Sequence, residues 1–283
     1  MCRIFAQIAV DERDPSDYIV HSSCSLLAQS KAKKDFLQED GWGIAALNGR
    51  GFKIFKSPNP IYREAELLKK AARGGKSRIV IAHIRAASNP LKLPKRQLIA
   101  KEHNQPFGAS NLTFAHNGTI NIAAAARERL LGPYRKNLKG KNDSEIYFWI
   151  LYKWYRKTGD VARAFEKTAQ ELWQLWRELP KSRRKGWKYP YTGLNAAVSD
   201  GRRLWALCHS LMPAQSKSLC LKDQPYNRLA LKLSEGGRRL VIGSEKLGQE
   251  PGWTVVPMHS LTVAEESNGL ILYQTRRFPW RRI

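Results

Sequence analysis

Short apolar runs alternate with clusters of turn residues along the chain, and this pattern predicts a protein that mixes strands and helices. Residues 2–10 are predicted to form a buried strand, and residues 78–84, a β-branched run, another. Residues 41–47 and 52–56 are predicted to pair across the turn residues between them. Further strands are predicted at 111–116, 193–199, 203–209, 219–221, 240–243, 253–257 and 270–274.

Helical spacing of apolar residues appears mainly in the middle of the chain. It predicts helices at 62–73, at 121–131, after Asp143 and from about 161 to 179, with Asn142 or Asp143 as a cap and Glu145 in the first turn. Residues 89–106 hold three prolines and are predicted to be loop. Strands at both ends with helices between them favour two stacked sheets covered by helices, an α+β domain.

The length of 283 residues and the 42% hydrophobic content suit one large core or at most two domains. No linker is long enough to divide the chain, so we expect one domain over residues 2–275. A basic insertion near residues 180–190 and a basic tail at residues 276–283 are expected to complete it.

The chain shows no secretory signal and no run close to the ~20 apolar residues of a membrane span. Its cysteines, Cys2, Cys24, Cys208 and Cys220, lack the CxxC spacing of metal sites. We therefore expect free thiols in a reducing cytoplasm, with no membrane partner, no metal and no other cofactor.

The formal net charge is +25, from 49 Lys and Arg against 24 Asp and Glu. Such a charge attracts polyanions, nucleic acid among them. The basic residues gather around 135–141, 181–188 and 276–282, and aromatic side chains that stack on single strands in other proteins lie among them (Tyr134, Trp187, Tyr189 and Trp280). No nucleic-acid-binding signature accompanies them, so a generally basic surface is favoured and a nucleic-acid partner stays an alternative.

Cys2 is the first candidate for chemistry because it follows Met1 directly. Removal of Met1 would give one residue a thiol nucleophile and a free α-amine. An α-amine has a pKa of about 7.7–8.0, so it can act as the base for the thiol without a histidine. A second-position cysteine alone is more often only the start of a strand.

Three further segments offer groups that suit an amino-acid substrate. Arg85 ends an apolar strand, where its guanidinium could make a bidentate contact with a carboxylate, and Ser88 could be a further donor. Asn117 and Gly118 offer a side-chain amide and a backbone N–H to one point, as an oxyanion hole does. Asp143 could hold an ammonium group. Each segment also has an ordinary structural interpretation as a strand end, a turn or a helix cap.

Together these groups describe a site that binds an α-amino acid and attacks a carbonyl further along its side chain. Glutamine or another γ-glutamyl amide fits this description. Two glycines around Trp42, in the segment Asp40-Gly41-Trp42-Gly43, would let a backbone or ligand come close.

At this point the chain resembles the class II glutamine amidotransferases of the N-terminal-nucleophile hydrolase superfamily, and among them the small stand-alone type. The resemblance rests on the order of short motifs over roughly the first half of the chain. These are Met1-Cys2, Asp40-Gly41-Trp42-Gly43-Ile44, His83-Ile84-Arg85-Ala86-Ala87-Ser88, Gln105-Pro106-Phe107, Phe114-Ala115-His116-Asn117-Gly118 and Asp143-Ser144-Glu145, with a late strand segment at 242–247.

The resemblance implies a four-layer αββα sandwich of two antiparallel sheets and a role for each site residue. Cys2 would be the nucleophile and its amine the base, and Asn117 with Gly118 would form the oxyanion hole. Arg85, assisted by Ser88, would bind the substrate carboxylate. Asp143, together with the Gly118 region, would bind its amine.

Two departures from the family pattern could alter substrate fit. Gln105-Pro106-Phe107 stands where relatives usually have His-Pro-Phe, and Ser88-Asn89 follows the arginine where some have Thr-His or Thr-Gly. The basic insertion matches nothing in the family.

The resulting hypothesis is hydrolysis of glutamine or a γ-glutamyl compound through a Cys2 thioester. A γ-glutamyl hydrolase of a small-molecule pathway and a non-catalytic, RNA-associated protein of the same fold are the alternatives. Because the chain ends at Ile283 without room for a synthase domain, a separate ammonia-accepting subunit is expected if the ammonia is used.

Overall fold

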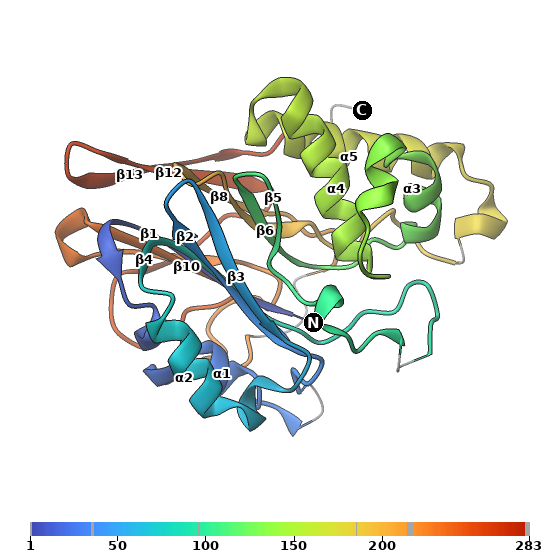
Figure 1. The fold of residues 1–283 in the computed structure, drawn as a ribbon. Coiled ribbons are helices and arrows are strands. Elements are labelled where there is room, and N and C mark those ends of the chain that lie inside the picture. Colours follow the sequence, from blue (N-terminus) through green and yellow to red (C-terminus); the bar gives the residue numbers. More distant parts are fainter. Residues whose placement is uncertain (1, 35–36, 95–96, 185, 214–217, 281–283) are drawn as a thin grey trace.

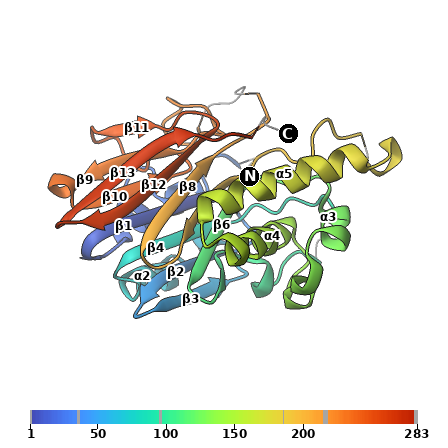
Figure 2. The same cartoon turned by 90° about the horizontal axis from the view of Figure 1, so that it is seen from above.

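The computed structural model describes residues 2–34, 37–94, 97–184, 186–213 and 218–280. Two antiparallel sheets are stacked face to face, with α1 (Leu26–Gln29) and α2 (Ala65–Arg73) on one outer face and α3 (Ala123–Arg129), α4 (Asp143–Thr158) and α5 (Val161–Glu178) on the other (Figures 1 and 2). The predicted α+β class and its four-layer αββα arrangement are confirmed.

Among the described residues the first sheet has seven strands and places β1 at its centre. In spatial order they are β11 (Trp253–Val255), β9 (Ala230–Ser234), β10 (Arg239–Gly243), β1 (Arg3–Arg13), β4 (Ser77–Ile84), β2 (Trp42–Asn48) and β3 (Gly51–Ser57). Arg3 pairs with Ile84 of β4 and Phe5 with Gly243 of β10, which fixes what lies beside the start of β1.

The second sheet has six strands within the described residues. In spatial order they are β13 (Leu270–Arg277), β12 (Ser260–Ser267), β8 (Arg203–Cys208), β7 (Asn195–Ser199), β6 (Leu112–Asn117) and β5 (Phe107–Ala109). Asn117, the last residue of β6, pairs with Asn195, the first of β7.

The alternation of side chains along β1 explains how the layers pack. Ile4 and Ile8 face the second sheet, where they join a core cluster with Ala115 and Ala206. Phe5 points the other way, into a cluster under α1 and α2. Because successive strand residues face opposite sides, the buried part of this one strand, residues 3–9, supplies both cores.

The two long helices on the second sheet each begin after a polar residue that caps the helix N-terminus. Asn142 caps α4 by accepting a hydrogen bond from Glu145 N at 2.7 Å, and Asp160 caps α5 in the same way. The predicted cap and its helix are confirmed. The apolar faces of α4 and α5 cover the second sheet through residues such as Phe148 and Leu172.

Several predicted elements need correction. Residues 219–221 are not a strand, because the N–H groups of Leu219 and Cys220 donate to the carboxylate of Glu245 instead of a strand ladder. Strands β5, β9 and β12 were not predicted, and α3 is shorter than residues 121–131. β13 extends to Arg277, so the first two residues of the predicted tail belong to a strand, while residues 281–283 lie outside the described part of the chain.

Within the described residues, no helix combines the length and the apolar character needed to cross a bilayer.

Candidate active site

Cys2 lies one residue before β1, beside the end of β4. The pairing of Arg3 with Ile84 places Cys2 next to Arg85, the residue that follows β4. The Cys2 Sγ is 3.5 Å from the carbonyl oxygen of Ala86, to which its thiol donates. The sheet register therefore brings the expected nucleophile to the expected carboxylate receptor.

The electrostatic environment of Cys2 is mixed. Burial raises the pKa of its thiol, while the positive charge of Arg85 lowers it and the negative charge of Asp143 raises it again. The net direction is upward, so the thiol at rest is protonated. An adjacent base is therefore required before the sulfur can act as a nucleophile.

Arg85 is a buried cation without an acidic partner. It is 3% exposed, and its Nη1 donates to the carbonyl oxygens of Leu98 at 2.6 Å and Asp40 at 3.4 Å. Burial lowers its pKa. Among the described residues no carboxylate reaches salt-bridge distance of this guanidinium, which leaves it able to bind an incoming one.

Asp143 is the matching buried acid. Its Oδ2 accepts a hydrogen bond from Ile120 N at 2.7 Å, and its Oδ1 accepts one from Ser88 Oγ at 3.2 Å. Burial raises its pKa, and these two hydrogen bonds and Arg85 oppose that shift. Ser88, expected as a helper of Arg85, thus has its hydroxyl directed at Asp143.

The Asp40-Gly41 segment braces the loop that follows β4. The Asp40 carboxylate accepts a hydrogen bond from Ala87 N at 2.7 Å, Asp40 N donates to Arg85 O, and Arg85 N donates to Gly41 O. These bonds fix residues 85–87, against which the Cys2 thiol lies.

Asn117 and Gly118 lie at the end of β6 in the facing sheet, two residues before Ile120. A side chain at Gly118 would place its Cβ 2.1 Å from Gly193 O, so only glycine fits. Asn117 is 4% exposed, and its Oδ1 has no hydrogen-bond partner among the described residues. Both residues line a cavity of about 20 Å³ with Asn195 and other polar groups, enough for one water molecule.

The described contacts therefore join Cys2, Arg85, Ser88 and Asp143 in one group. Asn117 and Gly118 attach to this group through the short segment that leads to Ile120, whose N–H binds Asp143.

Two supporting residues were not predicted. The side chain of Gln105 holds the backbone of β6 just before Asn117, because its Oε1 accepts from His116 N at 2.6 Å and its Nε2 donates to His116 O at 3.2 Å. This gives the unusual Gln105 a structural role. The sequence signal was the departure itself, since glutamine offers both a donor and an acceptor.

The ring of His116 is buried and neutral. Burial lowers its pKa to about 4. Its Nε2 lies 3.0 Å from Gly193 O, which can only accept, so Nε2 carries the proton and Nδ1 accepts from Ser144 Oγ at 2.9 Å. His116 thus connects the end of β6 to the start of α4 and to the segment at Gly193 that approaches Gly118.

Several groups of the basic clusters already have partners. Arg183 pairs with Glu128, and Arg184 lies over the ring of Trp176 at 5.0 Å. Tyr134 stacks on Trp149. Lys185, Arg281 and Arg282 are outside the described residues. Of the aromatic side chains in these clusters, Tyr134 is thus stacked within the protein, while Trp187 is 42% exposed.

Sequence comparison places these observations in a family. A profile of the family described as "Glutamine amidotransferases class-II" matches residues 1–275. The curated protein "Putative glutamine amidotransferase YafJ" of Escherichia coli (strain K12) is 32% identical over 181 residues, 60% of this chain and 60% of that protein. "Putative glutamine amidotransferase" of Haemophilus influenzae is 30% identical over 179 residues, 60% of this chain and 51% of that protein. The chain thus aligns with less than two thirds of either relative.

Solved structures share the fold. The glutamine aminotransferase class-II domain protein of Silicibacter pomeroyi superposes with a TM-score of 0.64 at 18% identity and covers 98% of this chain and 99% of its own. The glutamine phosphoribosylpyrophosphate amidotransferase of B. subtilis superposes with a TM-score of 0.59 at 16% identity, over 98% of this chain and 49% of that enzyme.

Proposed function

The chain belongs to the class II glutamine amidotransferases, and from this premise we propose that it hydrolyses the side-chain amide of glutamine, or of a related γ-glutamyl compound, through a thioester on Cys2. Removal of Met1 frees the α-amine of Cys2, which then serves as the base for its own thiol. The raised pKa of the thiol makes such a base necessary.

The substrate head group binds between two buried charges. Arg85 takes the α-carboxylate, since its guanidinium is buried and no described carboxylate pairs with it. Asp143, held by Ser88 and Ile120 N, takes the α-ammonium. A zwitterion that enters this space brings each buried charge its opposite, which offsets the cost of burying them.

The reaction then proceeds in two steps. The sulfur attacks the side-chain amide carbon while its proton passes to the α-amine of Cys2, and the oxyanion that forms is stabilised by the Asn117 amide and Gly118 N–H. Loss of one such donor costs about 2.7–4 kcal/mol in other enzymes. The protonated amine gives its proton to the leaving nitrogen, ammonia departs, and water hydrolyses the thioester to release glutamate.

The observation that carries this proposal is the grouping of the Cys2 thiol with the unpaired Arg85 and with Asp143 in one buried place. A purely structural role would favour a direct pairing of the two opposite charges. Their separation suits a ligand that carries both charges itself.

Turnover of L-glutamine and of a γ-glutamyl dipeptide, each measured as glutamate release by wild type and by the Cys2→Ala variant, tests the proposal. We expect release by wild type only. Release by the variant at the wild-type rate would overturn the thioester route, and exclusive use of the dipeptide would favour the γ-glutamyl hydrolase alternative.

The ammonia acceptor is proposed to be a separate subunit. Pull-down of a partner whose presence raises glutaminase turnover would support this, and glutamate release that no partner changes would favour simple hydrolysis.

A further inference from the structure

A second cluster of reactive side chains lies behind the start of β1. Cys24, Cys220 and Glu245 bring two sulfur atoms and a carboxylate oxygen to within 4.8 Å of one another. They come from three separate parts of the chain, because Cys24 precedes α1, Cys220 follows β8 and Glu245 follows β10. The fold, not local sequence spacing, brings them together.

The carboxylate in this cluster is held in a fixed orientation. Glu245 is 1% exposed, and it accepts hydrogen bonds from Leu219 N and Cys220 N, each at 3.1 Å. Arg3 lies on its other side, with Nε 3.6 Å from Oε1. Outer contacts of this kind orient a metal ligand and are typical of built metal sites.

The position of Cys24 is also supported. Its side chain is fully buried, and its carbonyl oxygen accepts a hydrogen bond from Gln29 Nε2 at 2.8 Å. Cys220, the third member, is only partly buried, so an ion can reach the cluster from that side.

The two thiols and the carboxylate lie close enough together to share one ion. A divalent cation displaces the protons of the thiols it binds and is attracted to the carboxylate beside them.

We infer that Cys24, Cys220 and Glu245 form a binding site for a thiophilic divalent cation of the Zn²⁺ class. Ligand atoms of a tetrahedral zinc site lie about 3.8 Å apart, given zinc–sulfur bonds of ~2.3 Å. The observed cluster needs only a small contraction to reach this. Two thiolates and a carboxylate carry three negative charges, which the dication and the neighbouring Arg3 guanidinium balance.

Three protein ligands leave the fourth position of a tetrahedral ion to water, as in catalytic zinc sites. The residues around this cluster nevertheless favour a structural role for the ion. The Arg3 guanidinium carbon lies 3.7 Å from the centre of the Tyr226 ring, and Arg3 Nη1 is 3.4 Å from Tyr226 O. Asn227, the next residue, lines the cavity beside Asn117. An ion on Cys220 would therefore fasten the loop that carries Tyr226 and Asn227 beside the candidate active site.

Cobalt titration of the full-length Cys2→Ala protein tests this site independently of glutaminase activity. The background substitution removes the Cys2 thiol as a competing ligand. After chelator treatment and in the presence of a phosphine reductant, we expect Co²⁺ to bind at about one per chain and to give thiolate-to-cobalt charge-transfer absorption with tetrahedral visible bands. Zn²⁺ is expected to displace it completely.

Single variants at the ligands identify the site. We expect Cys24→Ser, Cys220→Ser and Glu245→Gln each to weaken Co²⁺ binding by more than about 100-fold, because even a group that only orients a ligand costs about 10–100-fold. Cys208→Ala is the matched control, since Cys208 is a buried free thiol outside the cluster, and it is expected to keep the full spectrum.

Because substitution of the buried Cys24 can disturb folding, circular dichroism accompanies each titration, and the partly buried Cys220 provides the decisive variant. Absence of the charge-transfer band, its persistence in Cys220→Ser, or its loss in Cys208→Ala alone would overturn the assignment. Formation of a Cys24–Cys220 disulfide once the reductant is removed, in a protein that bound no metal in its presence, would overturn it too.

Discussion

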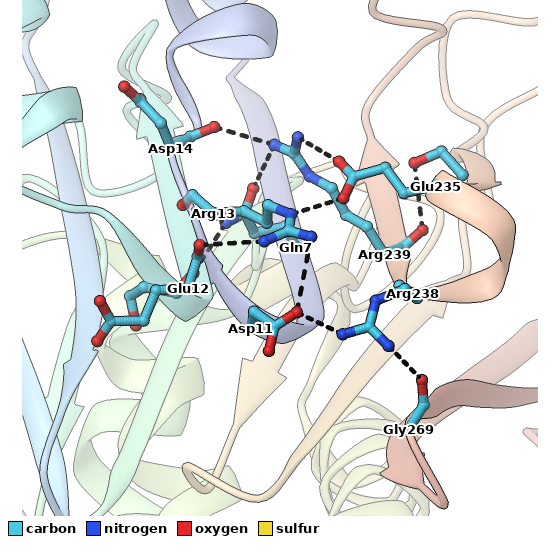
Figure 3. A network of polar contacts seen from close by, with 11 residues as sticks. Gln7, Asp11, Glu12, Arg13, Asp14, Glu235, Arg238, Arg239 and Gly269 are labelled. Carbon is cyan, nitrogen blue, oxygen red and sulfur yellow. Dashed lines mark hydrogen bonds and ion pairs between the residues drawn. The ribbon is translucent and has the colours of Figure 1, made fainter.

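Charged side chains are paired differently at the two ends of strand β1. Where β1 ends, Arg13 and Arg239 share the carboxylate of Glu235 at 2.6 and 3.3 Å, and Arg239 also donates to Gln7 at 2.7 Å (Figure 3). Where β1 begins, the donors of Arg85 reach only backbone carbonyls among the described residues. At the end of β1 both arginines have a carboxylate partner, whereas at its start Arg3 lies beside Glu245 but Arg85 has no carboxylate at salt-bridge distance among the described residues.

The pKa values follow this difference. Burial raises the pKa of Glu235, but hydrogen bonds from Arg13 and Arg239 outweigh it and lower the pKa overall. Burial also raises the pKa of Asp143, and there the opposing hydrogen bonds and the charge of Arg85 do not outweigh it. At the end of β1, partners from the chain stabilise the ionised carboxylate of Glu235. At its start, Arg85 and Asp143 are left to be neutralised by a zwitterionic ligand.

The largest expected effect concerns Cys2. Cys2→Ala should lower glutaminase turnover by about 10⁴-fold or more, because loss of a nucleophile removes the covalent route altogether. Arg13→Ala, at the other end of β1, is the control and should keep wild-type turnover. Glutamate release assays decide this, and equal losses in the two variants would contradict a division of roles between the ends.

A matched pair of arginine substitutions tests the comparison next. Arg85→Met should lower kcat/KM by about 10²–10³-fold, in keeping with the 2–5 kcal/mol that truncation of a buried charge contact costs. It should not lower the free energy of unfolding, since an unpaired buried charge is replaced by an apolar group.

Arg239→Met should do the opposite. It removes the donor to the buried Gln7 Oε1, so we expect a loss of about 1–3 kcal/mol in the free energy of unfolding with little change in kcat/KM. Urea unfolding and steady-state kinetics on both variants provide the readout. Equal destabilisation by the two substitutions would remove the distinction between the sites.

The pH dependence of stability should differ in sign between Asp143 and Glu235. The folded-state pKa of Asp143 is raised above the ordinary 3.8, so ionisation destabilises the folded protein and stability is lost as pH rises through the folded pKa. The pKa of Glu235 is lowered below the ordinary 4.5, so its contribution is present above that value and lost as pH falls.

As pH increases, the free energy of unfolding of Asp143→Asn should therefore rise relative to that of wild type. The free energy of unfolding of Glu235→Gln should fall relative to wild type over the same range. Urea unfolding of both variants from about pH 3 to 6 measures this difference. The same slope in both would show that the two carboxylates have similar environments.

The smallest effect is expected for the exposed pair of Arg183 and Glu128, whose side chains are 47% and 50% exposed. Arg183→Ala should change neither Tm nor turnover measurably, because exposed ion pairs contribute little. Differential scanning calorimetry checks this. A clear drop in Tm would show that pairing alone, without burial, accounts for the stability of the network at the end of β1.

The sequence predicted most of the fold because its signals are local. The β-branched run of β4, the turn residues between β2 and β3, and the cap of α4 each specify their own backbone conformation. The false strand at 219–221 shows the limit, since its N–H groups bond to Glu245, a residue about 25 positions away.

The candidate site residues came from ordered motifs, but their contacts needed the fold. No sequence pattern shows that Ser88 turns toward Asp143, or that Gln105 clamps the backbone of β6. Both contacts depend on the tertiary fold, because Ser88 follows β4 of the first sheet and meets α4, while Gln105 precedes β5 and meets β6, its neighbour in the second sheet. The same holds for Cys24, Cys220 and Glu245, whose spacing in the sequence resembles no metal motif.

Intact-mass spectrometry after incubation with a diazoketone analogue of glutamine shows whether Cys2 is an N-terminal nucleophile. We expect a chain that lacks Met1, carries a single adduct on Cys2, and gains no adduct when excess glutamine is present. A chain that keeps Met1 yet turns over glutamine, or an adduct that persists in Cys2→Ala, would contradict it.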